Sequence, residues 1–176
     1  MNYKRIFIQN SCVHLVIIAY NRNPIFINNI DLLQKAIENA LQYFQFEIIA
    51  SCFLPDHIHI IIKPADIFEY PKIITAIKYY FSKFYNVGVE TPTYGYLNKG
   101  EKGVFQRRYY EHTIVSEDDL SIHVDYIHFN PIKHGYVKQA KDWKYSTFMK
   151  YVENEFYDEC WCNFEDKNKI KDLNYE

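Results

Sequence analysis

Two histidines separated by one residue are the first side chains in the sequence that could do chemistry. His57 and His59 lie within His57–Lys63, an isoleucine-rich run that ends at Pro64 and therefore predicts a strand. Side chains alternate across a strand, so both imidazoles point to one face and the isoleucines point to the other, toward the core. Two imidazoles on one face can hold a divalent metal ion from a rigid base. Two surface histidines on an open sheet face would show the same spacing, so the pair alone leaves both interpretations open.

A helix that is expected to begin after Ser116 brings a second group of polar side chains. Ser116 and Asp119 form an SxxD capping pattern. At about 100° per residue, one face of this helix carries Leu120, Val124 and Ile127, and the opposite face carries Asp119, His123, Tyr126 and Asn130. A tyrosine and an asparagine one turn apart could act at one centre, as nucleophile and as oxygen ligand. The alternative is a surface tyrosine, with the asparagine serving only to end the helix before Pro131.

The remaining pattern predicts the elements that must position these residues. Strands are expected at Cys12–Tyr20, Phe46–Leu54, His57–Lys63 and Val104–Tyr110, with Phe46, Ile48, Ala50, Cys52 and Leu54 on one face of the second. Helices are expected after Asn28 or Asn29, from Pro71 to Gly88, from Ser116 to Asn130, and near Asp142–Val152, with a loop over 89–103. A tight turn at Pro55-Asp56 makes the second and third strands antiparallel. The fold class is therefore α+β, a ferredoxin-like β-α-β-β-α-β antiparallel sheet with added C-terminal helices.

Composition narrows the class of protein further. The 176 residues are 48% hydrophobic and 24% charged, which is enough for one domain with a real core. There are only five glycines, and neither GxGxxG nor GxxxxGK[ST] occurs, which excludes the common dinucleotide and P-loop sites. Apolar runs fall far short of the roughly 20 residues that a membrane helix needs, and the N-terminus lacks a signal-peptide core. We expect a cytoplasmic protein with no membrane partner. Reduced thiols without catalytic roles are expected at Cys12, Cys52, Cys160 and Cys162.

Charge is unevenly distributed along the chain. The net charge of −2 argues against a nucleic-acid partner, but residues 151–176 hold eight acidic residues against three lysines. Residues 131–150 hold five lysines against Asp142, and a second basic group lies between Lys99 and Arg108. Local basic patches matter more than the total for phosphate binding, although lysines also simply solvate a surface. The candidate DNA-binding residues are Arg107, Arg108, His112, Lys133, Lys138, Lys141 and Lys144.

Four separated segments carry a resemblance to a known family. The segments FLPDHIHIIIKP, VFQRRYYEHTI, HVDYIHFNPIKHGYV and DWKYSTF occur in order and resemble the REP-associated tyrosine transposases, which are relatives of the single-tyrosine HUH transposases. HUH denotes two histidines around a bulky apolar residue, here His57, Ile58 and His59. The resemblance covers roughly residues 10–150. It implies a catalytic domain at 1–150, followed by an acidic C-terminal tail at 151–176.

The resemblance also implies roles for individual residues. His57 and His59 match the metal-binding pair, Tyr126 matches the nucleophile, and Asn130 matches the position expected to give a third metal ligand. It implies cleavage of single-stranded DNA through a 5′-phosphotyrosine link, with recognition of short palindromes folded as hairpins. Imidazole ligands favour transition metals, but oxygen ligands from phosphate and water permit Mg²⁺ or Mn²⁺, one of which we expect as cofactor. The protein is expected to be a monomer or a homodimer.

Two other functions remain open from the sequence. A domesticated protein could bind hairpin DNA tightly without turnover. A metal-dependent phosphoesterase could use water in place of Tyr126 as nucleophile. Formation of a covalent adduct with DNA distinguishes both from a transposase, because neither alternative forms one.

Overall fold

The computed structural model describes residues 5–85 and 103–161 and contains a four-stranded antiparallel sheet. The strands are β1 (Val13–Ile18), β2 (Phe46–Phe53), β3 (His57–Pro64) and β4 (Tyr110–Thr113), in the spatial order β2-β3-β1-β4. The helices are α1 (Ile30–Leu41), α2 (Tyr70–Phe84), α3 (Glu117–Lys133) and α4 (Phe148–Glu153). The element order β-α-β-β-α-β followed by further helices confirms the predicted α+β class and is that of the ferredoxin-like pattern.

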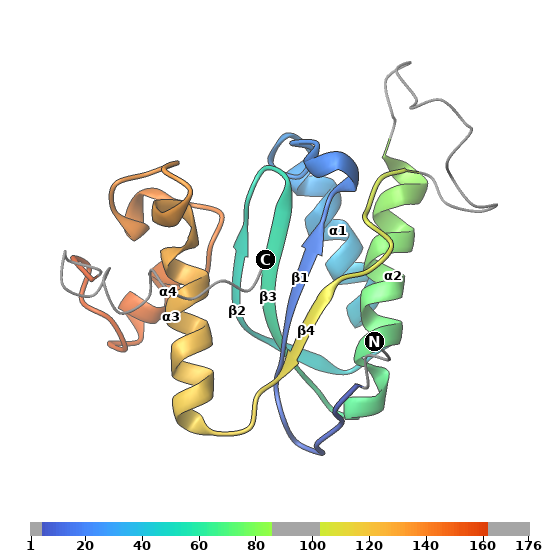
Figure 1. Ribbon diagram of the computed structural model, residues 1–176, viewed down its shortest axis with the longest axis horizontal. Coiled ribbons are helices and arrows are strands. Elements are labelled where there is room, and N and C mark those ends of the chain that lie inside the picture. The colour runs from blue at the N-terminus through green and yellow to red at the C-terminus, as the bar shows by residue number, and fades with distance from the viewer. Residues whose placement is uncertain (1–4, 86–102, 162–176) are drawn as a thin grey trace.

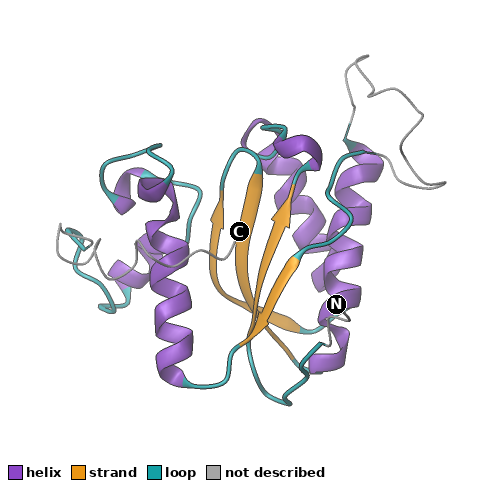
Figure 2. Cartoon of the chain, in the orientation of Figure 1, coloured by secondary structure: helices purple, strands orange, loops and turns teal. Residues whose placement is uncertain are grey.

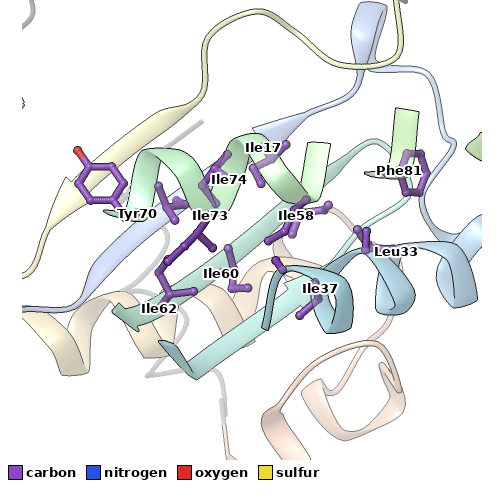
Figure 3. Packing of buried hydrophobic residues seen from close by; sticks show 14 of the residues in the cluster. Ile17, Leu33, Ile37, Ile58, Ile60, Ile62, Tyr70, Ile73, Ile74 and Phe81 are labelled. Carbon is purple, nitrogen blue, oxygen red and sulfur yellow. The ribbon is translucent and has the colours of Figure 1, made fainter. Parts of the chain in front are cut away.

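The two faces of the sheet are covered differently. Helices α1 and α2 lie on one face, and α3 and α4 lie on the other side (Figures 1 and 2). Against α1 and α2, the sheet presents the isoleucines Ile58, Ile60 and Ile62 of β3, which pack with Ile73 and Ile74 of α2 (Figure 3). Burying each such side chain stabilises the fold by about 1.5–3 kcal/mol. This apolar layer forms the main hydrophobic core. The opposite face of the sheet is covered by α3.

Strand β2 changes face halfway along its length. The expectation of one continuous alternating face is wrong, because the register against β3 shifts between Ile48 and Ala50. Phe46 and Ile48 pack in the core under α1 and α2, whereas Ala50 and Cys52 pack with α3. A β-bulge inserts one extra residue and so reverses which side chains face each layer.

Strand β4 is later and shorter than predicted. Val104–Gln106 still bonds to the end of β1, through the amide of Tyr20 to the carbonyl of Val104 (2.9 Å) and the amide of Gln106 to the carbonyl of Ile18 (2.9 Å). The regular ladder resumes only where Tyr110 pairs with Val16. The segment 106–109 thus lies opposite two residues of β1, so the chain bulges away from the sheet edge. Arg107 and Arg108 are exposed on this bulge.

Helix α3 continues past the proline expected to end it. It includes Pro131 and ends at Lys133, one turn later than predicted. The helix closes at Gly135, whose φ of +72° is the left-handed conformation that glycine adopts most readily, and the amide of Tyr136 bonds to the carbonyl of Pro131 (2.9 Å). Because of this extra turn, Lys133 belongs to the same helix as Tyr126.

The C-terminal region is less helical than predicted. In place of one helix near Asp142–Val152, there is a 3₁₀ turn at Ala140–Asp142, and α4 begins only at Phe148. Between them the chain bonds to the free edge of β2, through the amide of Phe53 to the carbonyl of Tyr145 (2.8 Å) and the amide of Thr147 to the carbonyl of Ser51 (2.9 Å). Edge pairing competes with helix formation for the same backbone groups.

Several predictions lie outside the described residues: most of the 89–103 loop, Gly88, Lys99, Cys162 and the tail beyond 161. Cys12, Cys52 and Cys160 are free thiols, as expected. Within residues 5–85 and 103–161, no helix is both long and apolar enough to cross a bilayer.

Candidate active site

The His57/His59 pair is buried beneath α3. Both side chains have 0% relative exposure, and their ring centroids lie 5.1 Å apart. Direct pairing across the antiparallel strands places further polar side chains on the same face of the sheet, because paired residues point the same way. These are His14 of β1 and Tyr110 and His112 of β4. The pair therefore belongs to a buried polar sheet face, and the alternative of two surface histidines is wrong.

Helix α3 brings Tyr126 directly onto this pair. The Tyr126 ring lies 5.5 Å from the His59 ring, centroid to centroid, and the tyrosine is fully buried, so it is not a surface residue. Two turns later, the His134 ring lies 4.9 Å from that of His57. Asn130 is one turn from each of them on the same side of the helix. The helix therefore carries Asn130 between the two contacts to the histidine pair.

The polar and apolar faces of α3 lie side by side, in contrast to the opposite faces that were predicted. Val124 and Ile127 pack with Ala50, Cys52 and Ile61 of β2 and β3. The polar side chains contact β1, β3 and β4. Both stripes can face the sheet because they differ by only about 100° around the helix. The remaining side is exposed at Ser121 and Ile122, and α4 packs against it at His128. The predicted N-cap is confirmed by the Ser116 hydroxyl, which accepts from the amide of Asp119 (3.1 Å).

A hydrogen bond to a carboxylate sets which nitrogen of His57 has a lone pair. His57 donates from Nδ1 to the Asp56 carboxylate (2.7 Å), which leaves Nε2 as its acceptor nitrogen. His59 Nδ1 lies 3.3 Å from Nε2 of His14. Burial of the Asp56 carboxyl acts to raise its pKa, but the hydrogen bond and charge of His57 lower the pKa below its usual value. Asp56 and His14 thus orient the two rings, as the partners of metal-binding histidines do.

The donor atoms present fit a metal ion. Burial, and then the positive neighbours, lower the pKa of His59 and of His14 well below their ordinary values, so both rings are neutral, which is the ligand form. Among the described residues, His59 Nε2 and both amide atoms of Asn130 are buried without a hydrogen-bond partner. Buried polar atoms of this kind are costly unless a ligand satisfies them.

Lys133 lies at the tyrosine hydroxyl. Its Nζ donates a hydrogen bond to Tyr126 Oη (2.8 Å), and the lysine is half-buried. The sequence placed Lys133 among the DNA-backbone contacts because Pro131 was expected to end the helix before it. In the longer helix, Lys133 is two turns from Tyr126 on the same stripe.

The other candidate DNA-binding residues lie apart from this cluster. Arg107 and Arg108 are exposed on the bulge of the β4 edge, opposite Ile18, which itself pairs with His57. Lys138 and Lys144 are exposed beyond the end of α3, and Lys141 pairs with Glu159 (2.8 Å).

His112 belongs to a different group. Its Nε2 bonds to the Asp119 carboxylate (2.9 Å), and His123 lies against the same carboxylate (3.1 Å). One ligand atom from each of these three residues lies within 4.8 Å of the others, a His/Asp arrangement that could hold a metal ion.

Sequence reasoning missed three residues of this region: His14, Lys133 as a partner of the tyrosine, and His134. The available signal for His14 was a histidine inside an otherwise apolar strand, which must find a polar partner when buried. His134 follows the proline that was expected to end the helix.

Comparison with known proteins identifies the family of this chain. Residues 7–130 match the family described as Transposase IS200 like. A REP-associated tyrosine transposase of Escherichia coli K12 is 31% identical over 90% of this chain and 89% of its own length. A Haemophilus influenzae protein assigned to the same group is 34% identical, over 91% and 92% respectively. The solved structure of a REP-associated tyrosine transposase bound to a REP hairpin superposes with a TM-score of 0.81 at 29% identity, covering 99% of this chain and 96% of that one. The chain belongs to the IS200-like transposase family, within the REP-associated tyrosine transposases.

Burial of histidines makes the fold sensitive to acid. Burial lowers the pKa of His128 to about 3, from an unfolded value of 6.5. Between these values the unfolded state binds a proton that the folded state does not, so the free energy of unfolding is expected to fall as pH drops below about 6.5. Urea unfolding at a series of pH values measures this slope. His128→Gln can keep the hydrogen bond to Thr147 and is expected to reduce the slope by up to about 1.4 kcal/mol per pH unit. An unchanged slope would contradict the assignment.

Proposed function

We propose that this protein cleaves and rejoins single-stranded DNA at hairpin-forming palindromes, with Tyr126 as the nucleophile and a 5′-phosphotyrosine as the intermediate. The observation that carries the proposal is the packing of the Tyr126 ring against His59, in the buried sheet face that also holds His57. Membership in the transposase family supports the same chemistry. A water-using phosphoesterase has no need of a tyrosine at this position.

A Mg²⁺ or Mn²⁺ ion held by His57, His59 and Asn130 would supply Lewis-acid stabilisation of charge on the scissile phosphate. The remaining steps of cleavage and rejoining are carried out by side chains of the protein. The Tyr126 oxygen forms a bond to phosphorus as the bond to the 3′-oxygen breaks, and the phenolic proton is balanced by the proton gained at the leaving 3′-hydroxyl. Attack of another 3′-hydroxyl on the phosphotyrosine reverses these bonds, releases the tyrosine and completes strand transfer.

Lys133 stabilises negative charge on the tyrosine oxygen during this step. Its ammonium donates to that oxygen at 2.8 Å, and a hydrogen bond from a cation to an oxygen that gains charge is strengthened in a buried setting. Tyr126 has no exposed surface in this structure, so the phosphate can reach it only when covering side chains move. Lys133 is half-buried and hydrogen-bonded to the reacting atom, which places it at the entrance.

Hairpin DNA is the proposed partner. A related transposase of the same fold has been solved bound to a REP hairpin. Phosphate contacts are proposed for exposed or partly exposed cationic residues around the site, which lie on the β4 bulge and beyond α3. These are Arg107, Arg108, Lys138, Lys141 and Lys144.

The nucleophile can be tested directly by trapping its adduct. Incubation with hairpin-containing single-stranded DNA and Mg²⁺ or Mn²⁺ is expected to give a covalent protein–DNA species on a denaturing gel. Tyr126→Phe removes only the hydroxyl and is expected to abolish this species while hairpin binding persists. Tyr70→Phe changes an equally buried tyrosine on the opposite face of the sheet and should leave the adduct intact. An adduct that survives Tyr126→Phe rejects Tyr126, and hairpin binding without any adduct in the wild type favours a domesticated binding protein.

Measuring the cleavage rate and the DNA affinity separately distinguishes a role of Lys133 at the tyrosine from a role in contacting the DNA backbone. Lys133→Gln is expected to slow adduct formation by about 100-fold, the effect of removing one donor from a developing anion, while the Kd for the hairpin changes little. Lys138→Gln, at an exposed lysine, should instead weaken hairpin binding and lower the slope of log K against log salt by about 1. Single-turnover cleavage and salt-dependent binding measure the two effects. The same salt-slope change in Lys133→Gln, at an unaltered cleavage rate, would show that Lys133 contacts phosphate.

A further inference from the structure

A cluster of three potential ligands lies outside the site described above. His112 comes from the edge strand β4, and Asp119 and His123 come from the first two turns of α3. The Asp119 carboxylate lies 2.9 Å from His112 Nε2 and 3.1 Å from His123 Nδ1, and the two imidazole rings stack 4.4 Å apart. One ligand atom from each residue falls within 4.8 Å of the others.

This donor set is chemically selective. Two imidazoles and one carboxylate suit borderline divalent ions such as Zn²⁺ or Co²⁺ better than Mg²⁺, which prefers oxygen. Ligand bonds of about 2.0–2.2 Å require donor atoms about 4 Å apart or less. Because the two stacked rings hold their lone pairs in nearly parallel planes, both imidazoles must rotate out of the stack to point at one ion. An ion at the centre would replace the two imidazole–carboxylate contacts, and also the 2.8 Å hydrogen bond that His123 Nδ1 makes to the backbone carbonyl of Asp119.

Protonation and access also suit an ion. Burial lowers the pKa of His123, which favours the neutral ring. Burial acts to raise the pKa of Asp119, but the hydrogen bonds from His112 and from the amide of Val115 lower it, so the carboxylate is ionised. His123 is almost fully buried at 2% exposure, whereas His112 is 34% exposed, which gives an ion a path from solvent.

The cluster is separate from the His57/His59 pair, and His14 lies between them. The His14 ring is 5.1 Å from that of His123 and 5.5 Å from that of His59. His123 also precedes Tyr126 by about one turn of the same helix. A cross-link at this point would therefore fix the start of α3 relative to β4, and with it the position of the tyrosine.

We propose that His112, Asp119 and His123 form a second divalent-metal site, selective for Zn²⁺ or a similar transition-metal ion, which fastens the edge strand β4 to the first turns of α3. The site is structural: the ion joins two elements that the chain connects only through residues 114–116. The proposal does not depend on DNA cleavage, and measurements of metal binding alone are sufficient to test it.

Metal stoichiometry of the full-length protein tests it. The protein is first stripped with chelator, then titrated with Zn²⁺ by calorimetry and with Co²⁺ by visible absorption. Asp119→Asn is expected to bind one equivalent fewer than the wild type and to lose most of the Zn²⁺-induced rise in Tm. Asp118→Asn is the matched control, because Asp118 is the adjacent exposed acid of the same helical turn, and it should behave as the wild type.

Two further variants keep the outcome decisive. His112→Ala removes a partly exposed ligand without opening a buried cavity and should lose the same equivalent as Asp119→Asn. His57→Ala/His59→Ala should lose a different equivalent, so that combining it with Asp119→Asn removes both. Undiminished stoichiometry in both Asp119→Asn and His112→Ala overturns the proposal and leaves the cluster a hydrogen-bond network only. An equal loss in Asp118→Asn overturns it as well.

Discussion

The structure depends on a sheet face that is buried although it is polar. His14, His57 and His59 are each fully enclosed between the sheet and α3. Enclosing a polar group without a hydrogen bond costs about 1–3 kcal/mol on mutational scales. The fold can therefore keep this face buried only if the helix that covers it also presents polar side chains toward it. Helix α3 places polar side chains on this side at residues 119, 123, 126, 130 and 133, spaced alternately by four and three along one stripe. In an ordinary amphipathic helix, residues at that spacing form the apolar face. In α3 the same spacing carries the candidate catalytic and metal-binding side chains.

The other face of the sheet makes this arrangement possible. The isoleucines of β3 alternate with the histidines, so the same eight-residue strand contributes both to the apolar core under α1 and α2 and to the polar layer under α3. Since the apolar layer stabilises the domain, α3 need not be selected for apolar burial along its whole width. Its apolar stripe, with Val124 and Ile127, packs over β2 and β3, and Tyr151 of α4 packs against the same cluster.

The parts of this design that follow from local periodicity could be predicted from the sequence. The alternation of His57, Ile58 and His59 gives the face of each, and the spacing of Tyr126 and Asn130 gives one side of a helix. The parts that depend on register could not. The bulges in β2 and before β4 reverse or expose side chains, and nothing in the local residue pattern marks their positions. The hydrogen bond from Lys133 to Tyr126 was not predicted, because Pro131 normally ends a helix. Here the helix continues through Pro131 to Lys133 and closes at Gly135, and its last turn brings the lysine to the tyrosine hydroxyl.

The direction of α3 also matches the charges that it must position. Its first turn holds Glu117, Asp118 and Asp119, where the partial positive charge of the helix N-terminus stabilises carboxylates. Its last turn holds Lys133, where the partial negative charge of the C-terminus stabilises an ammonium group. The carboxylate of Asp119 thus lies beside His112 and His123 at the start of the helix, and the amine of Lys133 lies beside Tyr126 at its end. If the helix ran in the opposite direction, the acidic side chains would lie at its partially negative C-terminus and the lysine at its partially positive N-terminus, and both interactions would be unfavourable. The direction of α3 therefore places two groups of side chains at different points along the sheet. Asp119 lies with His112 and His123 near its start, and Tyr126 and Lys133 lie beside the His57/His59 pair near its end.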